Sequence, residues 1–348
     1  MSTYPLFDAF PRLGRFPQAG LLCTATPLQP LPGADAVWIK RDDLSASDYG
    51  GNKIRKLDLL LGAALADGRS DLITFGYSGS NFVAATAWHG RKLGLDTHAF
   101  LLPQADAPYL ADNLATALHC GAELSVGHSE ASVAARALAC SLRISVRHGR
   151  LPRWIPPGGS TALGALGFVN AALELRTQID AGEMPVPKQL VVAFSSMGTV
   201  AGLAIGLGLA RLPTKIIAVQ VVGPGFASAA KLQALIQRTL ALLRRTEPLA
   251  VPQKIADVEI HGEFFGQHYA VPTSATKGAM QRFESASGAR SDSAYSGKAL
   301  AALYALVSTS AHPGPTLYWH TFNAHGRPPG VPALNRDQLA RFLSHSPE

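Results

Sequence analysis

The run Gly50-Gly51-Asn52-Lys53-Ile54-Arg55-Lys56-Leu57 is the most informative part of this 348-residue sequence. The two glycines let the backbone pass close to a neighbouring group, and Lys53 follows them where an amphipathic helix begins. The positive end of a helix disfavours a further positive charge and lowers the pKa of a lysine there. Such an amine is a nucleophile for aldehydes. An ordinary glycine turn with a solvated lysine explains the same spacing, so the run alone leaves both interpretations open.

The rest of the chain predicts alternating helices and strands. Apolar residues recur at helical spacing from Leu57 to Leu65, where a helix ends near Gly68. Further strands are predicted over 71–75, 97–102, 189–194, 216–222 and 317–319, and further helices over 80–93, 113–120, 131–143, 170–179, 200–210, 227–244 and 296–306. This alternation is typical of an α/β fold with a mostly parallel sheet. The proline- and glycine-rich residues 152–159 predict a crossover between two α/β units, and residues from 326 a surface tail with one short helix.

Two turns of small residues lead from a predicted strand into a predicted helix. In residues 75–81 (FGYSGSN), backbone amides could bind an anion such as a carboxylate, although Ser80 or Asn81 could act only as a helix N-cap. In residues 193–202 (AFSSMGTVAG), amides and hydroxyls suit a phosphate, although close helix–strand packing requires small residues too. The second turn lacks the Gly-Lys-Ser/Thr of a P-loop and the spaced glycines of a dinucleotide fingerprint.

A third candidate segment is Tyr295-Ser296-Gly297-Lys298, which opens a predicted helix. In a doubly wound fold its tyrosine and serine would lie at the edge of the sheet near the other loops. A capped helix with a packed tyrosine is the alternative. The eleven histidines show no metal-ligand spacing, and no Gly-x-Ser-x-Gly motif occurs, so we expect neither a metal site nor a serine hydrolase.

The composition excludes several protein classes. Hydrophobic residues make up 47% and charged residues 16% of the chain, the opposite of a disordered protein. The net charge of +7 would suit nucleic acid if the basic residues were clustered, but they are scattered. A small anionic ligand explains the excess at least as well. We therefore expect no nucleic-acid partner.

Cysteine usage and the N-terminus favour the cytoplasm. Cys23, Cys120 and Cys140 are too few and too far apart for a disulfide framework or a zinc site. The first residues lack the basic and apolar regions of a signal peptide. The uncharged residues 190–210 contain serines and glycines, which predict a buried strand, a turn and a helix rather than a membrane span.

The motifs and their order resemble those of the D-cysteine desulfhydrase / 1-aminocyclopropane-1-carboxylate deaminase family, a branch of the fold type II, tryptophan-synthase-β-like pyridoxal-phosphate enzymes. The resemblance covers about residues 10–321, nearly the whole chain. The matching segments, in order, are Lys40–Asp43 with Gly50–Leu57, Ser80-Asn81, Gly158–Ser160 with Ala162–Gly167, Gly198-Thr199 with Ala201-Gly202, Tyr269 before Val271-Pro272, Tyr295-x-Gly297-Lys298, and His320-Thr321.

This resemblance implies pyridoxal 5'-phosphate as the cofactor and a role for each matching residue. Lys53 would bind the cofactor covalently and move the α-proton of the substrate. The amides of Ser196, Met197, Gly198 and Thr199 would hold the phosphate, Asn81 would meet the ring hydroxyl, and Ser296 would face the pyridine nitrogen. Ser80 would bind the substrate carboxylate, and Tyr269 and Tyr295 would flank the substrate as acid–base or orienting groups.

The resemblance also implies a lyase or deaminase acting on a small amino acid. A serine at the pyridine nitrogen makes the ring a weaker electron sink than a carboxylate would, which favours β-elimination to pyruvate and ammonia, as in a D-cysteine desulfhydrase. The cyclopropane deaminases have glutamate at this position, and that activity is the alternative. Phe82, Met197 and Phe322-Asn323 depart from the family pattern, so a protein that binds the cofactor without turnover is a further alternative.

The expected architecture is two open, twisted, mostly parallel α/β domains with the cofactor in the cleft between them. By resemblance, residues 1–53 and 164–348 would form the large domain and residues 54–163 the small one. Relatives are usually homodimers, and we expect the same here, without a membrane partner.

Overall fold

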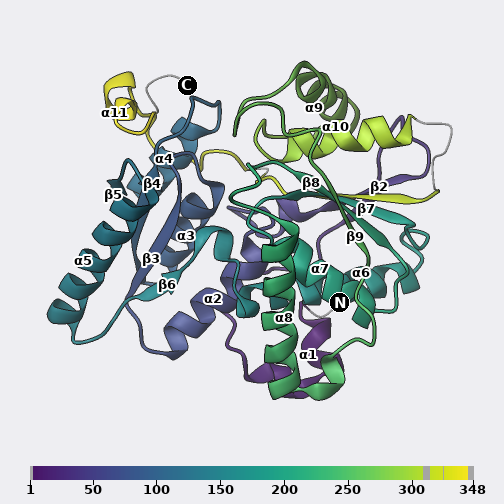
Figure 1. Cartoon of the computed structure of the whole chain (residues 1–348), viewed down its shortest axis with the longest axis horizontal. Coiled ribbons are helices and arrows are strands. Elements are labelled where there is room, and N and C mark those ends of the chain that lie inside the picture. The colour runs from purple at the N-terminus through teal and green to yellow at the C-terminus, as the bar shows by residue number, and fades with distance from the viewer. Residues whose placement is uncertain (1–2, 309–313, 324, 344–348) are drawn as a thin grey trace.

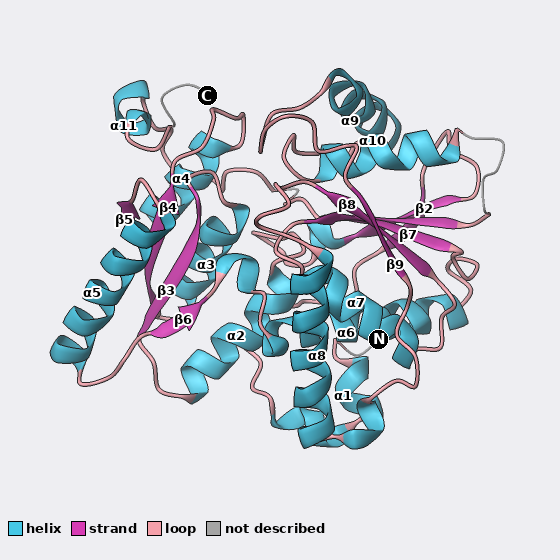
Figure 2. Ribbon diagram, viewed as in Figure 1, coloured by secondary structure: helices cyan, strands magenta, loops and turns pink. Residues whose placement is uncertain are grey.

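The computed structural model describes residues 3–308, 314–323 and 325–343, and it contains two β-sheets with helices packed on both faces of each (Figure 1, Figure 2). The six-stranded sheet has the order β1-β2-β10-β7-β8-β9, and only β1 runs antiparallel to its neighbour. The four-stranded sheet has the order β5-β4-β3-β6 and is entirely parallel. The prediction of an α/β fold with mostly parallel sheets is confirmed.

The six-stranded sheet is built from both ends of the chain. Its strands are β1 (Leu28–Pro30), β2 (Val37–Arg41), β7 (Gln189–Phe194), β8 (Lys215–Gln220), β9 (Val258–His261) and β10 (Thr316–His320). The helices associated with it are α1 (Pro5–Ala9), α2 (Ile54–Ala66), α6 (Ala162–Asp180), α7 (Gly198–Leu209), α8 (Ala229–Thr246), α9 (Ser274–Ser287) and α10 (Ser296–Val307). In Figure 1, α9 and α10 cover one face, and α6, α7 and α8 lie on the other.

The four-stranded sheet comes from one continuous part of the chain. Its strands are β3 (Asp71–Tyr77), β4 (Asp96–Leu102), β5 (Glu123–Val126) and β6 (Arg153–Ile155). Helices α3 (Asn81–Lys92) and α4 (Leu110–His119) lie on one side, α5 (Glu130–His148) covers the other, and α11 (Arg336–Ala340) follows near the C-terminus. Helix α2 packs against α6, one of the helices of the six-stranded sheet. The domain boundaries expected at residues 54 and 163 stay a prediction.

Strand β6 was not predicted from the sequence. It lies inside residues 152–159, which the sequence predicted only as a crossover. It is short and sits at the edge of its sheet, where prolines are tolerated nearby.

The uncharged residues 190–210 form a strand, a turn and a helix, as predicted. Among the described helices, none combines the length and apolar character needed to span a membrane.

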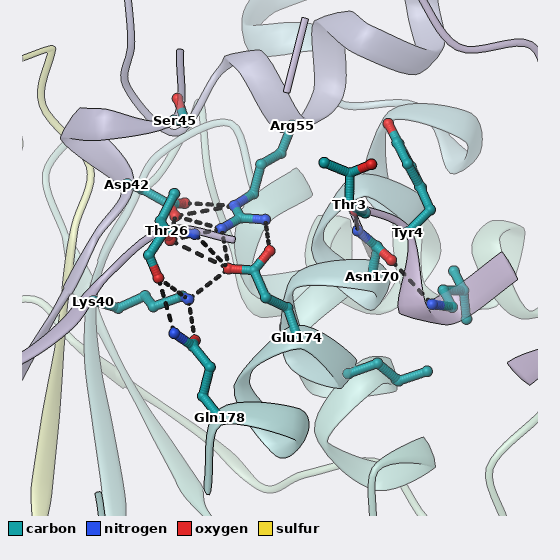
Figure 3. A network of polar contacts seen from close by, with 12 residues as sticks. Thr3, Tyr4, Thr26, Lys40, Asp42, Ser45, Arg55, Asn170, Glu174 and Gln178 are labelled. Atoms are coloured by element: carbon teal, nitrogen blue, oxygen red, sulfur yellow. Dashed lines mark hydrogen bonds and ion pairs between the residues drawn. The ribbon is translucent and has the colours of Figure 1, made fainter. Parts of the chain in front are cut away.

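A network of buried charges joins α2 to β2 and α6, which belong to the six-stranded sheet and its helices (Figure 3). Arg55 donates to the carboxylate of Asp42 through Nε and Nη2, at 2.8–3.0 Å, and to that of Glu174 through Nη1 at 2.8 Å. Lys40 donates to the same Glu174 at 2.5 Å. The side chains of all four residues are at most 3% exposed. Two positive and two negative charges therefore balance in the core, where unpaired charges would be costly.

We expect Glu174→Gln to lower the free energy of unfolding by about 3–5 kcal/mol, because it leaves Lys40 and Arg55 without a shared countercharge. Urea unfolding followed by circular dichroism measures the change. Asp35→Asn is the control, since Asp35 is exposed between β1 and β2, and its effect should stay within about 0.5 kcal/mol. Equal midpoints for the two variants would show that the network does not stabilise the fold.

Candidate active site

A cavity of about 590 Å³ lies where the carboxyl ends of strands from both sheets meet. Tyr77 and Leu102 end β3 and β4, Ser195 and Thr321 directly follow β7 and β10, and all four line the cavity. Loops at the carboxyl ends of parallel strands are the usual ligand site of open α/β sheets. The volume lies within the range of small-molecule pockets.

Lys53 opens into this cavity from the first turn of α2. It is half-buried, and burial lowers the pKa of its amine to about 8, although the carboxylate of Asp292 acts in the opposite direction. Its Nζ lies 5.6 Å from the ring centroid of Tyr295. A substantial fraction of the amine is thus neutral near physiological pH, so it can act as a nucleophile or a base.

The turn before α7 offers backbone amides to the cavity. The residue before the helix, Met197, provides no side-chain cap, and Ser160 Oγ accepts a hydrogen bond from the Gly198 amide, so the other amides at the start of α7 can bind an anion. Met197 adopts a left-handed conformation with φ 68° and brings the chain around to Gly198. A Cβ on Gly198 would lie 2.8 Å from Ser160 Oγ and 3.1 Å from Lys56 Nζ, so only glycine leaves this approach open. Thr199 Oγ1 accepts a hydrogen bond from Asn52 Nδ2 at 3.2 Å.

Lys56 and Ser160 belong to this anion-binding corner and were not assigned to the site from the sequence. Lys56 is fully buried, and its Nζ donates to the carbonyl of Gly158 at 2.9 Å. Burial and the nearby Lys53 hold the pKa of Lys56 well below its ordinary value. Among the described residues, the recorded hydrogen-bond acceptor of Lys56 is a neutral carbonyl, so a bound anion would supply the countercharge. The spacing of one helical turn from Lys53 is the signal that could have identified Lys56.

Ser80 and Asn81 line the cavity at the start of α3. Ser80 caps the helix by accepting a hydrogen bond from the amide of Val83 at 3.4 Å, so the capping interpretation is confirmed for this residue. The amide oxygen of Asn81 accepts a hydrogen bond from Asn113 Nδ2 at 2.7 Å, which fixes the orientation of its side chain. Capping and ligand contact are compatible, because both side chains still reach the cavity.

Tyr269 and Tyr295 form a pair at the cavity wall. Their hydroxyls are hydrogen-bonded to each other, and the ring of Tyr77 stacks on Tyr269 at a centroid distance of 4.8 Å. Burial raises the pKa of both Tyr269 and Tyr295 well above the ordinary value. Both hydroxyls are therefore protonated near neutral pH; one proton lies between the two oxygens, and the other can be donated to a ligand.

Ser296 lies behind the cavity wall rather than on it. It is fully buried, and its Oγ donates to Asp292 Oδ2 at 2.6 Å. Asp292 itself lines the cavity, and its carboxylate also accepts from the amides of Ala294 and Tyr295 at 2.9 and 2.6 Å. From the sequence we expected a neutral serine alone on this side of the site, whereas the structure adds a carboxylate. Its position three residues before Tyr295, where it caps α10, is the signal that could have identified Asp292.

The structure brings most of the predicted site residues together. The large cavity and a small one beside it are lined by Lys53, Ser80, Asn81, Ser196, Met197, Thr199, Tyr269 and Tyr295. Gly198 and Ser296 do not line either cavity, although Gly198 donates its amide proton to Ser160 Oγ at 3.2 Å. A nucleophilic amine, an anion-binding corner and two phenolic proton donors thus share one pocket. Together they suit a carbonyl compound that carries an anionic group.

Comparisons with known proteins agree with this chemistry. A family model described as pyridoxal-phosphate dependent enzyme matches residues 21–321. D-cysteine desulfhydrases of Salmonella paratyphi B (strain ATCC BAA-1250 / SPB7) and Salmonella newport (strain SL254) are both 34% identical to this chain over 323 residues, covering 90% of it and 95% of each relative. The crystal structure of an ACC deaminase homologue is 31% identical, with a TM-score of 0.78 over 99% of this chain and 100% of that one. A fungal L-serine ammonia-lyase from Rhizomucor miehei shares the fold at 17% identity and a TM-score of 0.58, over 92% of this chain and 98% of its own.

In protein treated with hydroxylamine and dialysed, which frees the amine of any bound aldehyde, we expect acetylation of Lys53 to increase with pH and to be half-maximal near pH 8. Only the neutral amine reacts, and its fraction rises as the pH passes through the lowered pKa of about 8. Lysines in model peptides titrate near 10.4. Acetic anhydride at a series of pH values, followed by peptide mass spectrometry, measures this profile, with exposed Lys277 of α9 as the reference. A half-maximal value near 10 for Lys53 would contradict the lowered pKa.

Proposed function

The chain belongs to the family of pyridoxal-phosphate dependent enzymes, and from this we propose that it is a lyase that catalyses β-elimination on an amino acid, releasing pyruvate and ammonia. The observation that carries the proposal is Lys53, whose amine has a pKa lowered to about 8 and opens into the cavity beside two tyrosine hydroxyls. Relatives named D-cysteine desulfhydrase support D-cysteine as a substrate.

The residues of the cavity fit the family's cofactor. Pyridoxal phosphate, when bound, supplies an electron sink next to the amino group of the substrate. Lys53 offers the amine that its aldehyde requires, and the start of α7, with Ser160 and buried Lys56 beside it, suits its phosphate. Ser196, Met197, Gly198 and Thr199 would contribute to the phosphate site, and Asn81 would contact the ring hydroxyl.

Each proton movement has a residue in position. Lys53 Nζ would take the proton from the substrate's Cα, because its lowered pKa makes it a base near neutral pH. The hydroxyl of Ser80 would bind the substrate carboxylate at the start of α3. The hydrogen-bonded pair of Tyr269 and Tyr295 would orient the substrate and give a proton to the leaving group.

Ser296 does not act on the cavity directly. Its hydroxyl donates to Asp292 Oδ2 and accepts from the Asp292 amide, and the side chain is fully buried behind the wall. Asp292 lines the cavity and places a carboxylate on this side of the site. The choice between a desulfhydrase and a cyclopropane deaminase therefore depends on the desulfhydrase relatives and on the measured substrate, not on Ser296 alone.

The purified protein should be yellow, and borohydride should bleach its visible absorption band. Lys53→Ala should lack this band, because the variant has no amine at this position to bind the cofactor covalently. Lys277→Ala, at an exposed lysine of α9, should keep the spectrum of the parent protein. A Lys53→Ala variant with the parent spectrum would assign the cofactor to a different lysine.

The same preparation separates the candidate activities. We expect pyruvate, ammonia and sulfide from D-cysteine. Turnover of 1-aminocyclopropane-1-carboxylate in place of cysteine would favour the deaminase. A yellow protein that releases no product from a panel of D- and L-amino acids would be a cofactor-binding protein without turnover, which would refute the lyase.

We also propose that two copies associate through α5. Leu138, Leu142 and Val146 repeat every four residues and are 56, 58 and 88% exposed, and Trp154, which donates a hydrogen bond to Ser141 of the same helix, is 42% exposed. An exposed apolar face of this kind marks an interaction surface. Figure 1 shows α5 along the outer edge of the molecule.

We expect light scattering to give the mass of a dimer for the parent protein and that of a monomer for a Leu142→Glu, Val146→Glu double variant. Leu249→Glu is the control, because Leu249 is 79% exposed but lies next to α8. A monomeric parent protein would refute the association.

We also propose that the enzyme is cytoplasmic, since its three cysteines are unpaired, as is usual in reducing compartments.

A further inference from the structure

One wall of the cavity is apolar and lies beyond the groups that react. It consists of Phe75 and Tyr77 of β3, Leu102 of β4, and Val133 and Ala134 of α5. Phe75, Tyr77 and Leu102 are only half-buried although they lie inside the molecule. Apolar surface left in contact with water in a pocket gains from an apolar ligand that covers it.

The wall exists because α5 does not reach the ends of β3 and β4. Phe75 pairs with Phe100, and Tyr77 pairs with Leu102 in the next position on the same face. Deeper in the sheet, this face is sealed by α5, where Ile73 and Phe100 cluster with Val133. Helix α5 begins only at Glu130, so its first turns border the cavity and leave the final strand positions uncovered.

The wall is continuous with the reacting groups. Lys53 Nζ lies 5.6 Å from the ring centroid of Tyr295, whose hydroxyl is hydrogen-bonded to that of Tyr269. Tyr77 stacks on Tyr269 and stands two residues from Phe75 on the same face of β3. A group that extends from the reacting carbons past the tyrosine pair would therefore meet aromatic rings.

The side chain of cysteine ends at its sulfur and has nothing to place against this wall. A substituent on the sulfur would extend away from Cβ, and an apolar ring there would cover Phe75 and Leu102. Discrimination by even one methylene in an apolar pocket reaches about 10- to 200-fold. The lining therefore distinguishes substrates by what the sulfur carries.

We propose that this site acts on S-substituted cysteines whose sulfur carries an apolar, aromatic-sized group; the inference rests on the proposed β-elimination. The Cα–H and Cβ–S bonds break, the thiol leaves with a proton, and water completes the release of pyruvate and ammonia. The balance is one thioether and one water giving one thiol, one pyruvate and one ammonium. No oxidant or reductant is needed.

The test compares S-benzylcysteine with S-methylcysteine, each as both enantiomers. Both release alkyl thiols, so the difference between them reports the apolar ring rather than the leaving-group chemistry. We expect kcat/KM, followed by pyruvate formation, to be at least about tenfold higher for the benzyl compound. Calorimetry with phenylalanine and alanine, which lack the leaving thiol, should show about tenfold tighter binding of phenylalanine.

A matched pair of variants locates the effect. Ala134 and Ala135 are adjacent, exposed residues of α5, but only Ala134 lines the cavity. Ala134→Trp should remove the preference for the benzyl compound, measured as the ratio of the two kcat/KM values within the variant. Ala135→Trp should leave both unchanged, and circular dichroism checks that both variants are folded.

Each contrary result would contradict a different part of the proposal. Equal kcat/KM for the benzyl and methyl compounds, with cysteine still converted, would overturn the substrate class and leave the lyase standing. A benzyl preference that survives Ala134→Trp would overturn the assignment to this wall. No pyruvate from cysteine or from either thioether would refute the lyase, and the substrate class would fall with it.

Discussion

The placement of Arg55 between Asp42 and Glu174 is the constraint on which the site depends. Lys53 lines the cavity, and Lys56, one helical turn later, is buried with its amine on the carbonyl of Gly158, whereas Arg55 forms its ion pairs in the core. The carboxylate of Asp42 is also held by the indole of Trp319 at 2.6 Å, so β2, β10, α2 and α6 meet there. The first turn of α2 is thereby fixed to the larger sheet, and both lysines with it.

This arrangement separates two opposing electrostatic requirements. The core pairs every charge of the network, which lowers the pKa of Glu174 to about 2 and keeps that carboxylate ionised. At the cavity, Lys53 instead lies close to the buried Lys56, with Asp292 as the carboxylate that acts on Lys53, and burial disfavours the charge on both amines. Unfavourable electrostatics at a functional site are tolerated where the surrounding structure is strongly held. Here Lys53, which carries the reactive amine, and Arg55, which holds this turn of α2 in the core, lie within one short segment of the chain.

The sequence predicted what depends on local order along the chain. Strand β7 has the predicted bounds, and Lys53, Ser80, Asn81 and Tyr295 line one cavity because each lies at an end of a predicted element, whereas Tyr269 was named only through the family resemblance. Lys56 was not assigned to the site, because its spacing from Lys53 places the two on one side of the helix but does not show its contact with a carbonyl 102 residues away. Asp292 was missed because a cap and a site residue look alike in a sequence. Strand β6 is too short to show alternation.

The reactive lysine and the apolar wall come from different layers of the fold. The lysine is fixed by the six-stranded sheet and its helices, while Phe75, Leu102 and Ala134 belong to the four-stranded sheet and α5. Substitutions in the wall leave the buried ion pairs untouched, since distant sites contribute independently to stability. A lineage with this architecture can diversify its substrates by single steps while its chemistry is inherited intact, and a protein engineer can follow the same route.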